Sequence, residues 1–406
     1  MFSNVGNWIQ TFALGWYVVE LAVREGVPER GPLYLGLVAG ARVAPGLVAG
    51  VVAGTVSNRV DRRRLLMLVQ VMNGANAVTL GALALTDHLG LVALLIATTL
   101  TGLVSAFDSP ARQAMVPALV PRTAISSAVG LMLATQNLAT VVGPLIGGLL
   151  IASIGVGGLL FLNAASYIVI IGALLSMRAI PLDHVATRAN VLRSMQEGFA
   201  YVWRDPVIRP LFVLLIVTGL GGRSLTQLMP AFAHDTLHAG AIELSWLLGA
   251  AGLGALAGSM LSASLGGFRR RGLLVVVCSA AFGALLVGFA MQTTLVPAIV
   301  LVLLASTAMQ LHITNHVTLY QMRTPPGLQG RVVGTSSTLS LTSGSVGALL
   351  IGSLGTVAGV NVAIGVGGAV LTVAALLILT RMAPLREVGT HRDHLFDVQA
   401  VAALSE

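Results

Sequence analysis

The sequence predicts an all-α membrane protein whose twelve transmembrane helices form two parallel, pseudo-symmetric six-helix bundles. Three observations support this fold. Hydrophobic residues make up 56% of the 406 residues and charged residues only 9%, which is too apolar for an ordinary soluble domain. The apolar stretches are about 20 residues long, as a membrane-spanning helix requires, and a backbone inside a bilayer must bond internally. Glycines also recur at a constant interval in the two halves, which indicates a duplicated unit.

Charged or Gly/Pro-rich breaks divide the chain into six spans, a polar linker and six further spans. The first six cover 1–23, 33–56, 65–86, 89–107, 124–153 and 157–177. The second six cover 207–231, 243–265, 272–292, 295–319, 332–357 and 359–381. We therefore expect an N-terminal bundle over 1–177, a cytoplasmic linker over 178–206, a C-terminal bundle over 207–381 and a cytoplasmic tail over 382–406.

The linker contains a short amphipathic pattern. Leu192, Met195, Phe199 and Val202 recur at helical spacing, with polar residues between them, which favours a helix lying on the membrane surface. A solvated connector without that helix is the alternative.

The distribution of arginine predicts the orientation. All 23 basic residues are arginine, and most lie in the loops 57–64, 108–123, 178–206, 266–271 and 320–331 or in the tail. Short arginine-rich loops stay in the cytoplasm. We expect both termini to face the cytoplasm of a bacterial inner membrane.

Eight glycines of the first half meet another glycine 204 positions later. The pairs are 15/219, 36/240, 50/254, 54/258, 130/334, 143/347, 148/352 and 155/359. Composition alone would give roughly two or three such pairs, so the coincidence favours two parallel repeats. In transporters of this plan, the substrate site lies between the repeats near the bilayer midplane.

Composition also argues against other classes. The formal charge of +8 is explained by membrane topology, so we expect no nucleic-acid partner. The single cysteine, Cys278, cannot form an intrachain disulfide, and the first apolar run lacks the features of a cleavable signal peptide. The sequence has no phosphate-binding Gly-x-x-x-x-Gly-Lys-Ser/Thr loop, and we expect no ATPase activity and no cofactor.

A densely charged turn follows the second span. It reads Gly54-Thr-Val-Ser-Asn58-Arg59-Val-Asp61-Arg62-Arg63-Arg64. This turn resembles the Gly-x-Leu-Ala-Asp-Arg-x-Gly-Arg-Arg/Lys signature of the major facilitator superfamily. The segments Ser3-Asn4-Val5-Gly6, Asp108-Ser-Pro-Ala-Arg112-Gln113 and Gln329-Gly330-Arg331-Val332 are similar to the bacterial branch of drug and siderophore exporters. The resemblance covers nearly the whole chain.

The resemblance implies a conformational gate at this turn. Arg62 should reach Asp108, near Arg112, while Arg59 and Arg63 should meet helix ends or lipid phosphate; Gly54 should allow a close approach of backbones. The alternative is simple anchoring by positive charge. Two residues depart from the family pattern: Asn58 replaces an acidic residue, and Thr98 stands where many exporters carry a proton-coupling arginine. The chain also starts abruptly for this family, so Met1 is a candidate for an internal start.

A second motif lies in the fifth span. It comprises Gly130, Ala139, Gly143, Pro144, Gly147 and Gly148. Ala139, Gly143 and Gly147 recur every four residues and give one smooth face on which another helix can pack closely. The motif resembles the antiporter motif of exporters, with Ala139 replacing a glycine, and it favours export over uptake.

Ionisable and polar residues inside the spans are candidates for substrate or proton binding, because buried charge in a membrane is costly. Glu20 and Arg223 lie at matching depths and are predicted to meet across an outer gate, unless each reaches the interface separately. Arg42 lies deeper. It either faces the cavity and attracts an anionic group or bonds backbone carbonyls.

Further candidates are polar. His312 and His316 lie one turn apart and could carry a proton; ordinary hydrogen bonding between helices is the simpler interpretation, and no third ligand for a metal is evident. The remaining possible cavity-lining residues are Asn7, Gln10, Gln136 and Asn137.

We therefore interpret the sequence as a proton-coupled exporter of amphipathic small molecules that works by alternating access. Its expected partners are the substrate, protons and the lipid bilayer, and nothing implies an oligomer. An uptake or facilitative transporter of the same fold is the nearest alternative. A membrane receptor or scaffold would normally add a soluble domain, and an enzyme would need a converging set of catalytic groups within the spans.

Overall fold

The computed structural model describes residues 2–56, 61–119, 121, 125–176, 191–222, 224–265, 268 and 270–381. Asn58, Arg59, Arg223 and the tail 382–406, for which the sequence makes predictions, lie outside the described residues. Gly54 and Arg62 are placed in helices, but their side-chain surroundings are likewise not described.

The N-terminal half consists of long helices. They are α1 (Phe2–Arg24), the short turn η1 (Pro28–Arg30), α2 (Gly31–Val56), α3 (Arg62–Leu85), α4 (Leu91–Leu119) and α5 (Ile125–Ser176). α5 contains two helices that meet at Gly155, where φ is 64° and ψ is −178°. A left-handed φ is accessible to glycine at little cost, and it ends one helix and starts the next. The fifth and sixth spans are therefore the two parts of α5.

The C-terminal half follows the amphipathic helix α6 (Val191–Arg204). Its first span is composite: α7 (Ile208–Val217), η3 (Thr218–Gly222), α8 (Ser224–Ala231) and η4 (Phe232–Thr236). Then come α9 (Ala241–Ser264), α10 (Arg271–Ala290), α11 (Leu295–Arg323), α12 (Gln329–Ala358) and α13 (Val360–Arg381). η3 and η4 are π-helical turns, which are rare and often mark functional segments.

The described helices are consistent with twelve crossings. Nine stretches of the described residues are long and apolar enough to span a membrane, with α5 counted once and α7–η4 taken together. Dividing α5 at Gly155 and adding α1 and α2 gives twelve. α1 is the more polar of these two because it carries Asn4, Asn7, Gln10 and Glu20.

Two predicted boundaries are wrong. The loop 108–123 is helical up to Leu119, so Asp108 and Arg112 lie within α4. An ion pair between these two residues, four positions apart, supports the start of this extension. The seventh span continues past residue 231 to Thr236. In both cases the helix extends beyond its apolar run, because the polar side chains of the added residues are solvated by water at the membrane boundary.

The helix predicted within the linker is present as α6 (Val191–Arg204), and its position on the membrane surface stays a prediction. Val202 is fully buried against Phe212, Tyr320 and Val332 of the C-terminal half. Phe199 is 46% exposed and stacks on Trp203 with ring centroids 5.5 Å apart. Glu197 also forms an ion pair with Arg331. α6 is therefore attached to the C-terminal half through Val202, while the aromatic pair faces outward.

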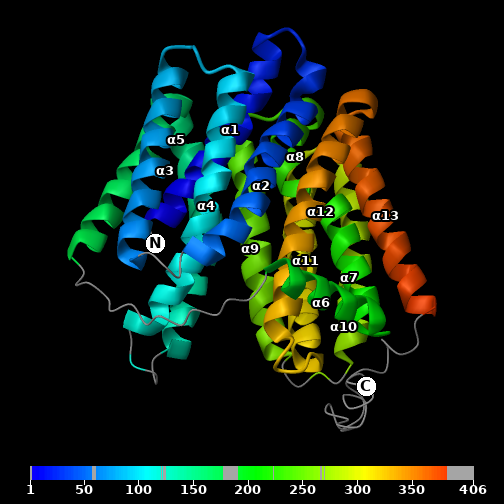
Figure 1. Ribbon diagram of the computed structural model, residues 1–406. Helices are drawn as coiled ribbons and strands as arrows, with labels where there is room; N and C mark the ends of the chain where they lie inside the picture. Colours follow the sequence, from blue (N-terminus) through cyan, green and yellow to red (C-terminus); the bar gives the residue numbers. More distant parts are fainter. Residues whose placement is uncertain are drawn as a thin grey trace.

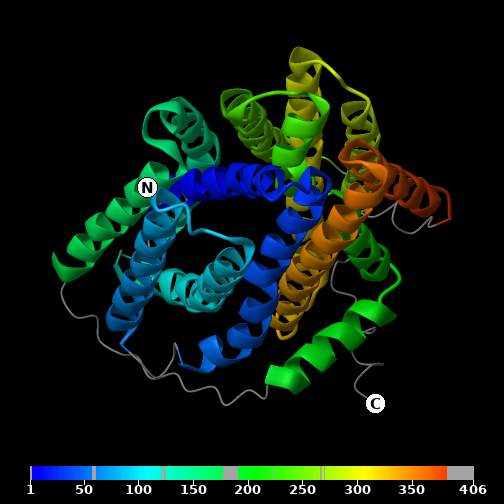
Figure 2. The same cartoon turned by 90° about the horizontal axis from the view of Figure 1, so that it is seen from above.

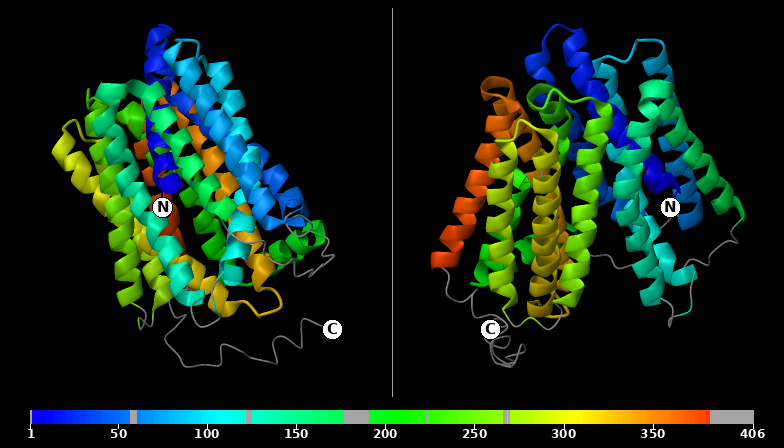
Figure 3. Two further views of the ribbon diagram at one scale, coloured as in Figure 1. Left: turned by 90° about the vertical axis from the view of Figure 1, so that its left-hand side faces the viewer. Right: turned by 180° about the vertical axis from the view of Figure 1, so that it is seen from behind.

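The two halves lie side by side and converge toward one end (Figures 1 and 2). We call the end where α6 lies the α6 end, and the end where α1 meets α2 and α12 meets α13 the far end. Both halves supply two helices to their interface: α2 packs on α12, and α5 packs on α9. The view from behind shows the halves close at the far end and spread apart at the α6 end (Figure 3, right).

Small residues allow the close contact at the far end. A Cβ atom on Gly36 of α2 would collide with the Ala348 backbone of α12, and one on Gly352 would collide with the Pro32 carbonyl. On the other side, Gly148 of α5 lies against Ser245 of α9. Close backbone approach of this kind is how membrane helices associate.

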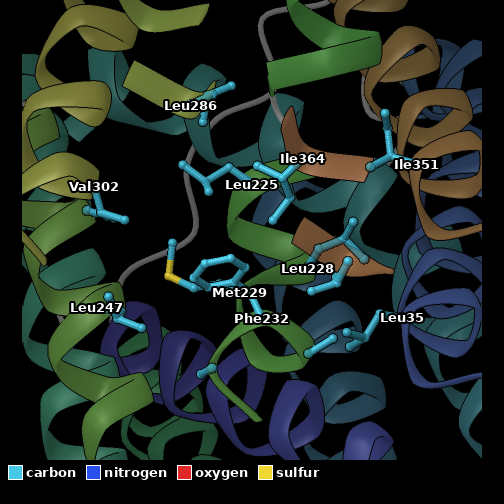
Figure 4. Packing of buried hydrophobic residues seen from close by; sticks show 14 of the residues in the cluster. Leu35, Leu225, Leu228, Met229, Phe232, Leu247, Leu286, Val302, Ile351 and Ile364 are labelled. Carbon is cyan, nitrogen blue, oxygen red and sulfur yellow. The ribbon is translucent and has the colours of Figure 1, made fainter. Parts of the chain in front are cut away.

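The hydrophobic core continues across the interface at the far end. Figure 4 shows side chains from α2, α8, α9 and α12 gathered around Met229 and Phe232. Phe232 is fully buried and stacks on Phe289 with centroids 4.2 Å apart. The far end is thus packed like a protein interior in this state.

Glycines related by the repeat occupy equivalent places. Gly155 and Gly359 have positive φ, at 64° and 91°, and each links the fifth to the sixth helix of its half. Gly143 packs on α1, and its mate Gly347 packs on η3 of the corresponding first helix of the other half. The two halves therefore share geometry at the positions where the sequence repeats.

Candidate functional site

The charged turn after α2 is tied to the neighbouring helices of its own half. Asp61 caps α3, because its carboxylate accepts hydrogen bonds from the backbone N–H groups of Arg63 at 2.9 Å and Arg64 at 3.4 Å. The Arg63 guanidinium donates to the carbonyl oxygens of Leu174 at 2.6 Å and Leu175 at 2.8 Å. These carbonyls belong to the last turn of α5, where a cation is favoured. The expected contact of Arg63 with a helix end is thus present, and its part in gating remains a prediction.

Asp108 is engaged by two donors. The Gln70 amide of α3 donates to it at 2.9 Å, and the Arg112 guanidinium donates to it at 3.0 Å. The predicted partner Arg62 has no described side chain, so the Arg62–Asp108 contact stays a prediction. Gln70 is only 2% exposed. The sequence analysis missed it, although a lone glutamine within the apolar α3 was a signal.

The antiporter-like face of α5 packs on α1. Ala139 is fully buried, Gly143 lies against Trp8 and the Val5 carbonyl, and Gly147 lies against the Phe12 ring. Gly148 points to the other half instead, and a Cβ atom on Gly130 would meet no atom within 4 Å. Pro144 lies inside the helix. The motif therefore joins α1 to α5 within one half, while its last glycine contacts the other half.

A polar network connects α1 with the second part of α5. The Tyr167 hydroxyl donates to the Asn7 side chain at 2.6 Å, and the Asn163 amide donates to the Gln10 side chain at 2.5 Å. Asn163 is fully buried. Asn7 and Gln10 were predicted to line the cavity, whereas Asn163 and Tyr167 were missed. Only their polarity within an apolar run could have marked them.

Arg42 lies halfway along α2. Its backbone is so close to Gly102 of α4 that a Cβ atom there would collide with the Arg42 carbonyl. The Arg42 side chain is exposed, and it interacts electrostatically with Tyr167. Of the two interpretations of Arg42, bonding to backbone carbonyls is not observed among the described residues.

The two predicted histidines lie inside the C-terminal half. His312 and His316 are 0% and 1% exposed, and their ring centroids are 5.7 Å apart. Ser279 of α10 lies 2.7 Å from His312 Nδ1, and His316 packs against Phe212 and Tyr320. Both Nε2 atoms are buried without a hydrogen-bond partner in the described structure. The pair thus makes contacts between helices and does not line an open surface.

Glu20 lies at the far end beside a cavity of about 590 Å³ that Arg24, Asp87 and Glu243 also line. The Trp16 indole donates to Glu20 at 2.7 Å. Its predicted partner Arg223 lies outside the described residues. Gln136 is exposed on the part of α5 nearest the α6 end, and the Asn137 carbonyl accepts a bond from Thr140.

Acidic, cysteine and histidine side chains form no group of three suited to a metal ion within the described part of the chain. His312 and His316 would supply two ligands only.

Comparisons with known proteins identify the family. The family model described as transmembrane secretion effector, of the major facilitator superfamily, matches residues 1–404. The multidrug efflux pump Tap of Mycolicibacterium fortuitum is 29% identical over 373 residues, which cover 88% of each chain. The enterobactin exporter EntS of Shigella boydii is 27% identical over 361 residues, which cover 88% of this chain and 83% of the relative.

Solved structures share the fold. The inward open conformation of the xylose transporter XylE from E. coli superposes with a TM-score of 0.72 at 12% identity and covers 98% of both chains. The nucleoside transporter NupG superposes with a TM-score of 0.71 at 10% identity, over 93% of this chain and 97% of that one. The chain is a multi-pass membrane protein and belongs to the major facilitator superfamily, in the family of transmembrane secretion effectors.

Proposed function

We propose that this protein exports amphipathic small molecules from a bacterial cytoplasm by alternating access, driven by the proton gradient. Two relatives are named as a multidrug efflux pump and an enterobactin exporter. Both names describe export, and the match covers most of this chain. Substrates of the drug or siderophore-like class are therefore the first to test.

One observation carries the proposal: the two halves touch along two helix pairs, α2–α12 and α5–α9, and the close contacts lie toward one end. At Gly36, Gly148 and Gly352 the helices of the two halves approach closely because these residues have no side chain. Such an interface can separate while the halves stay folded, because each half keeps its own helix packing. Two states that differ by a few kcal/mol are sufficient for alternating access.

The arginine distribution supports an orientation. Arg63, Arg112, Arg204, Arg323 and Arg331 all lie in the turns or helix ends at the α6 end. Arginine-rich segments remain in the cytoplasm. We infer that the α6 end and both termini face the cytoplasm, and that the described state is closed to the outside.

The gate belongs to the same proposal. Arg63 joins the start of α3 to the end of α5, and Asp108 joins α4 to α3 through Gln70. These bonds make the cytoplasmic end of the N-terminal half one unit, which can then move as a body. Gly54, Asn58, Arg59 and Arg62 are assigned to the same turn on the basis of their position in the motif.

Transport in everted membrane vesicles tests the direction. Vesicles that carry the protein should accumulate a macrolide or a catecholate siderophore when respiration acidifies their lumen, and a protonophore should abolish the accumulation. Gly143→Leu should abolish transport, since the leucine would collide with Trp8 and the Val5 carbonyl on α1. Gly172→Leu in the second part of α5 is the control, because a Cβ atom there meets nothing within 4 Å. Accumulation only in right-side-out vesicles would show uptake and overturn the proposal.

A further inference from the structure

Arg42 lies near the middle of the membrane, where a charged side chain is most costly. It is eleven residues after Gly31, where α2 begins, and so lies about 16 Å along the helix. This is close to half the thickness of a hydrocarbon core of about 30 Å. Ionisable residues at such depth are rare and mark functional positions.

The positive charge of Arg42 has no opposite charge paired with it among the residues that the structure describes. Within the residues that the structure describes, its guanidinium has no hydrogen bond and no ion pair. Asp108, the acidic residue of α4, is paired with Arg112 and Gln70. A guanidinium has five N–H donors in a planar fork, and here they remain available.

The position of Arg42 is fixed by backbone packing. Gly102 of α4 touches the Arg42 carbonyl and Cα, with no room for a side chain between the helices. The Arg42 side chain is exposed, and it interacts electrostatically with Tyr167, whose hydroxyl bonds to Asn7 of α1. Ionisable residues at this depth almost always face the bundle interior or a water-filled cavity, so the exposed Arg42 side chain is expected to face the cavity and not lipid.

We propose that Arg42 binds the anionic group of the substrate, and that the protein's preferred substrates are amphipathic anions such as carboxylates or catecholates. This inference rests on the proposed function and names its substrate class. The fork of the guanidinium matches a carboxylate or a pair of phenolate oxygens in bidentate geometry.

Binding to the purified full chain in lipid nanodiscs tests the proposal without requiring transport. The probe is 11-(dansylamino)undecanoate, a fluorescent anionic amphiphile, and its methyl ester is the neutral match. Empty nanodiscs give the partition background. Arg42→Gln should weaken binding of the anion about tenfold to a hundredfold, as loss of a charge-assisted hydrogen bond implies, and should leave ester binding unchanged. Arg42→Lys should retain part of the preference.

The control removes an equal charge elsewhere. Arg209→Gln, on the exposed start of α7, should leave both affinities unchanged, and thermal unfolding should report the same stability for all variants. Equal loss of anion and ester binding in Arg42→Gln would assign Arg42 a structural role and overturn the inference. Wild-type protein that binds the ester as tightly as the anion would overturn it as well.

The two proposals fail in different ways. If everted vesicles accumulate neutral or cationic drugs but the nanodisc assay shows no preference for the anion, the export function is supported and the proposed role of Arg42 is wrong. If the anion binds through Arg42 but is accumulated only in right-side-out vesicles, the site stands and the direction of transport is wrong.

Discussion

The contact between Gly36 and α12 should set the balance between the two transport states. Gly36→Leu places a side chain where the Ala348 carbonyl and the Leu349 Cα lie within 3.4 Å of the Cβ position. Overpacking at such a site costs about 1–3 kcal/mol. The cost applies only to the state in which α2 and α12 touch, so the equilibrium should shift by roughly fivefold to 150-fold toward the state with the far end open.

Distances between spin labels can measure this shift. Cys278 is the single cysteine, so a Cys278→Ser background allows labels at Glu29 and Val357, which are exposed at the far end of the two halves. Wild type should give mainly a short distance, and Gly36→Leu should populate a longer one, with reduced transport. Gly172→Leu is the control. An unchanged distance distribution in a folded Gly36→Leu variant would refute the reasoning.

Three other predictions concern the same structure. Arg63→Gln removes two charge-assisted hydrogen bonds to α5 and should lower both the transport rate and the melting temperature. The Arg64 side chain is 81% exposed, so Arg64→Gln should change neither quantity. Equal behaviour of the two variants would contradict the proposed role of Arg63. Gly155→Ala should destabilise the protein by about 1–2 kcal/mol, since φ there is left-handed, while Gly172→Ala should not, as thermal unfolding in detergent can measure. His316→Phe should change the free energy of unfolding by no more than about 1 kcal/mol, because loss of the hydrogen bond to the Leu211 backbone is offset by removal of the buried Nε2 atom that lacks a partner. Loss of proton-driven transport in a stable variant would instead make His316 a proton carrier.

Helix positions could be predicted closely because they depend on local chemistry. A span must be apolar for about 20 residues and must end where polar groups meet water. The breaks at Gly155 and Gly359 were visible as glycines at repeat-related positions. The errors at residues 108–119 and 232–236 arose because a helix can continue into water once the apolar run has ended.

The partners of the candidate residues could not be predicted in the same way. The Tyr167–Asn7 bond joins residues 160 positions apart, and neither residue type indicates its partner. The histidine pair had three possible roles in the sequence; burial of both rings against Phe212, Ser279 and Tyr320 removed it from any open surface. Hydrogen bonds across helices depend on packing, which no local pattern encodes.

By itself the sequence determined that the chain is a helical membrane protein with two repeats. The length of the apolar stretches, the positions of the arginines and the interval between the glycines can each be read directly from the sequence. Only the tertiary structure decided that the halves meet through α2–α12 and α5–α9, that Asp108 is held by Arg112 and Gln70, and that the Arg42 guanidinium has no partner among the described residues. The physical reason is that hydrophobic length is a property of each segment, whereas pairing of charges and close approach of backbones are properties of segments brought together by folding.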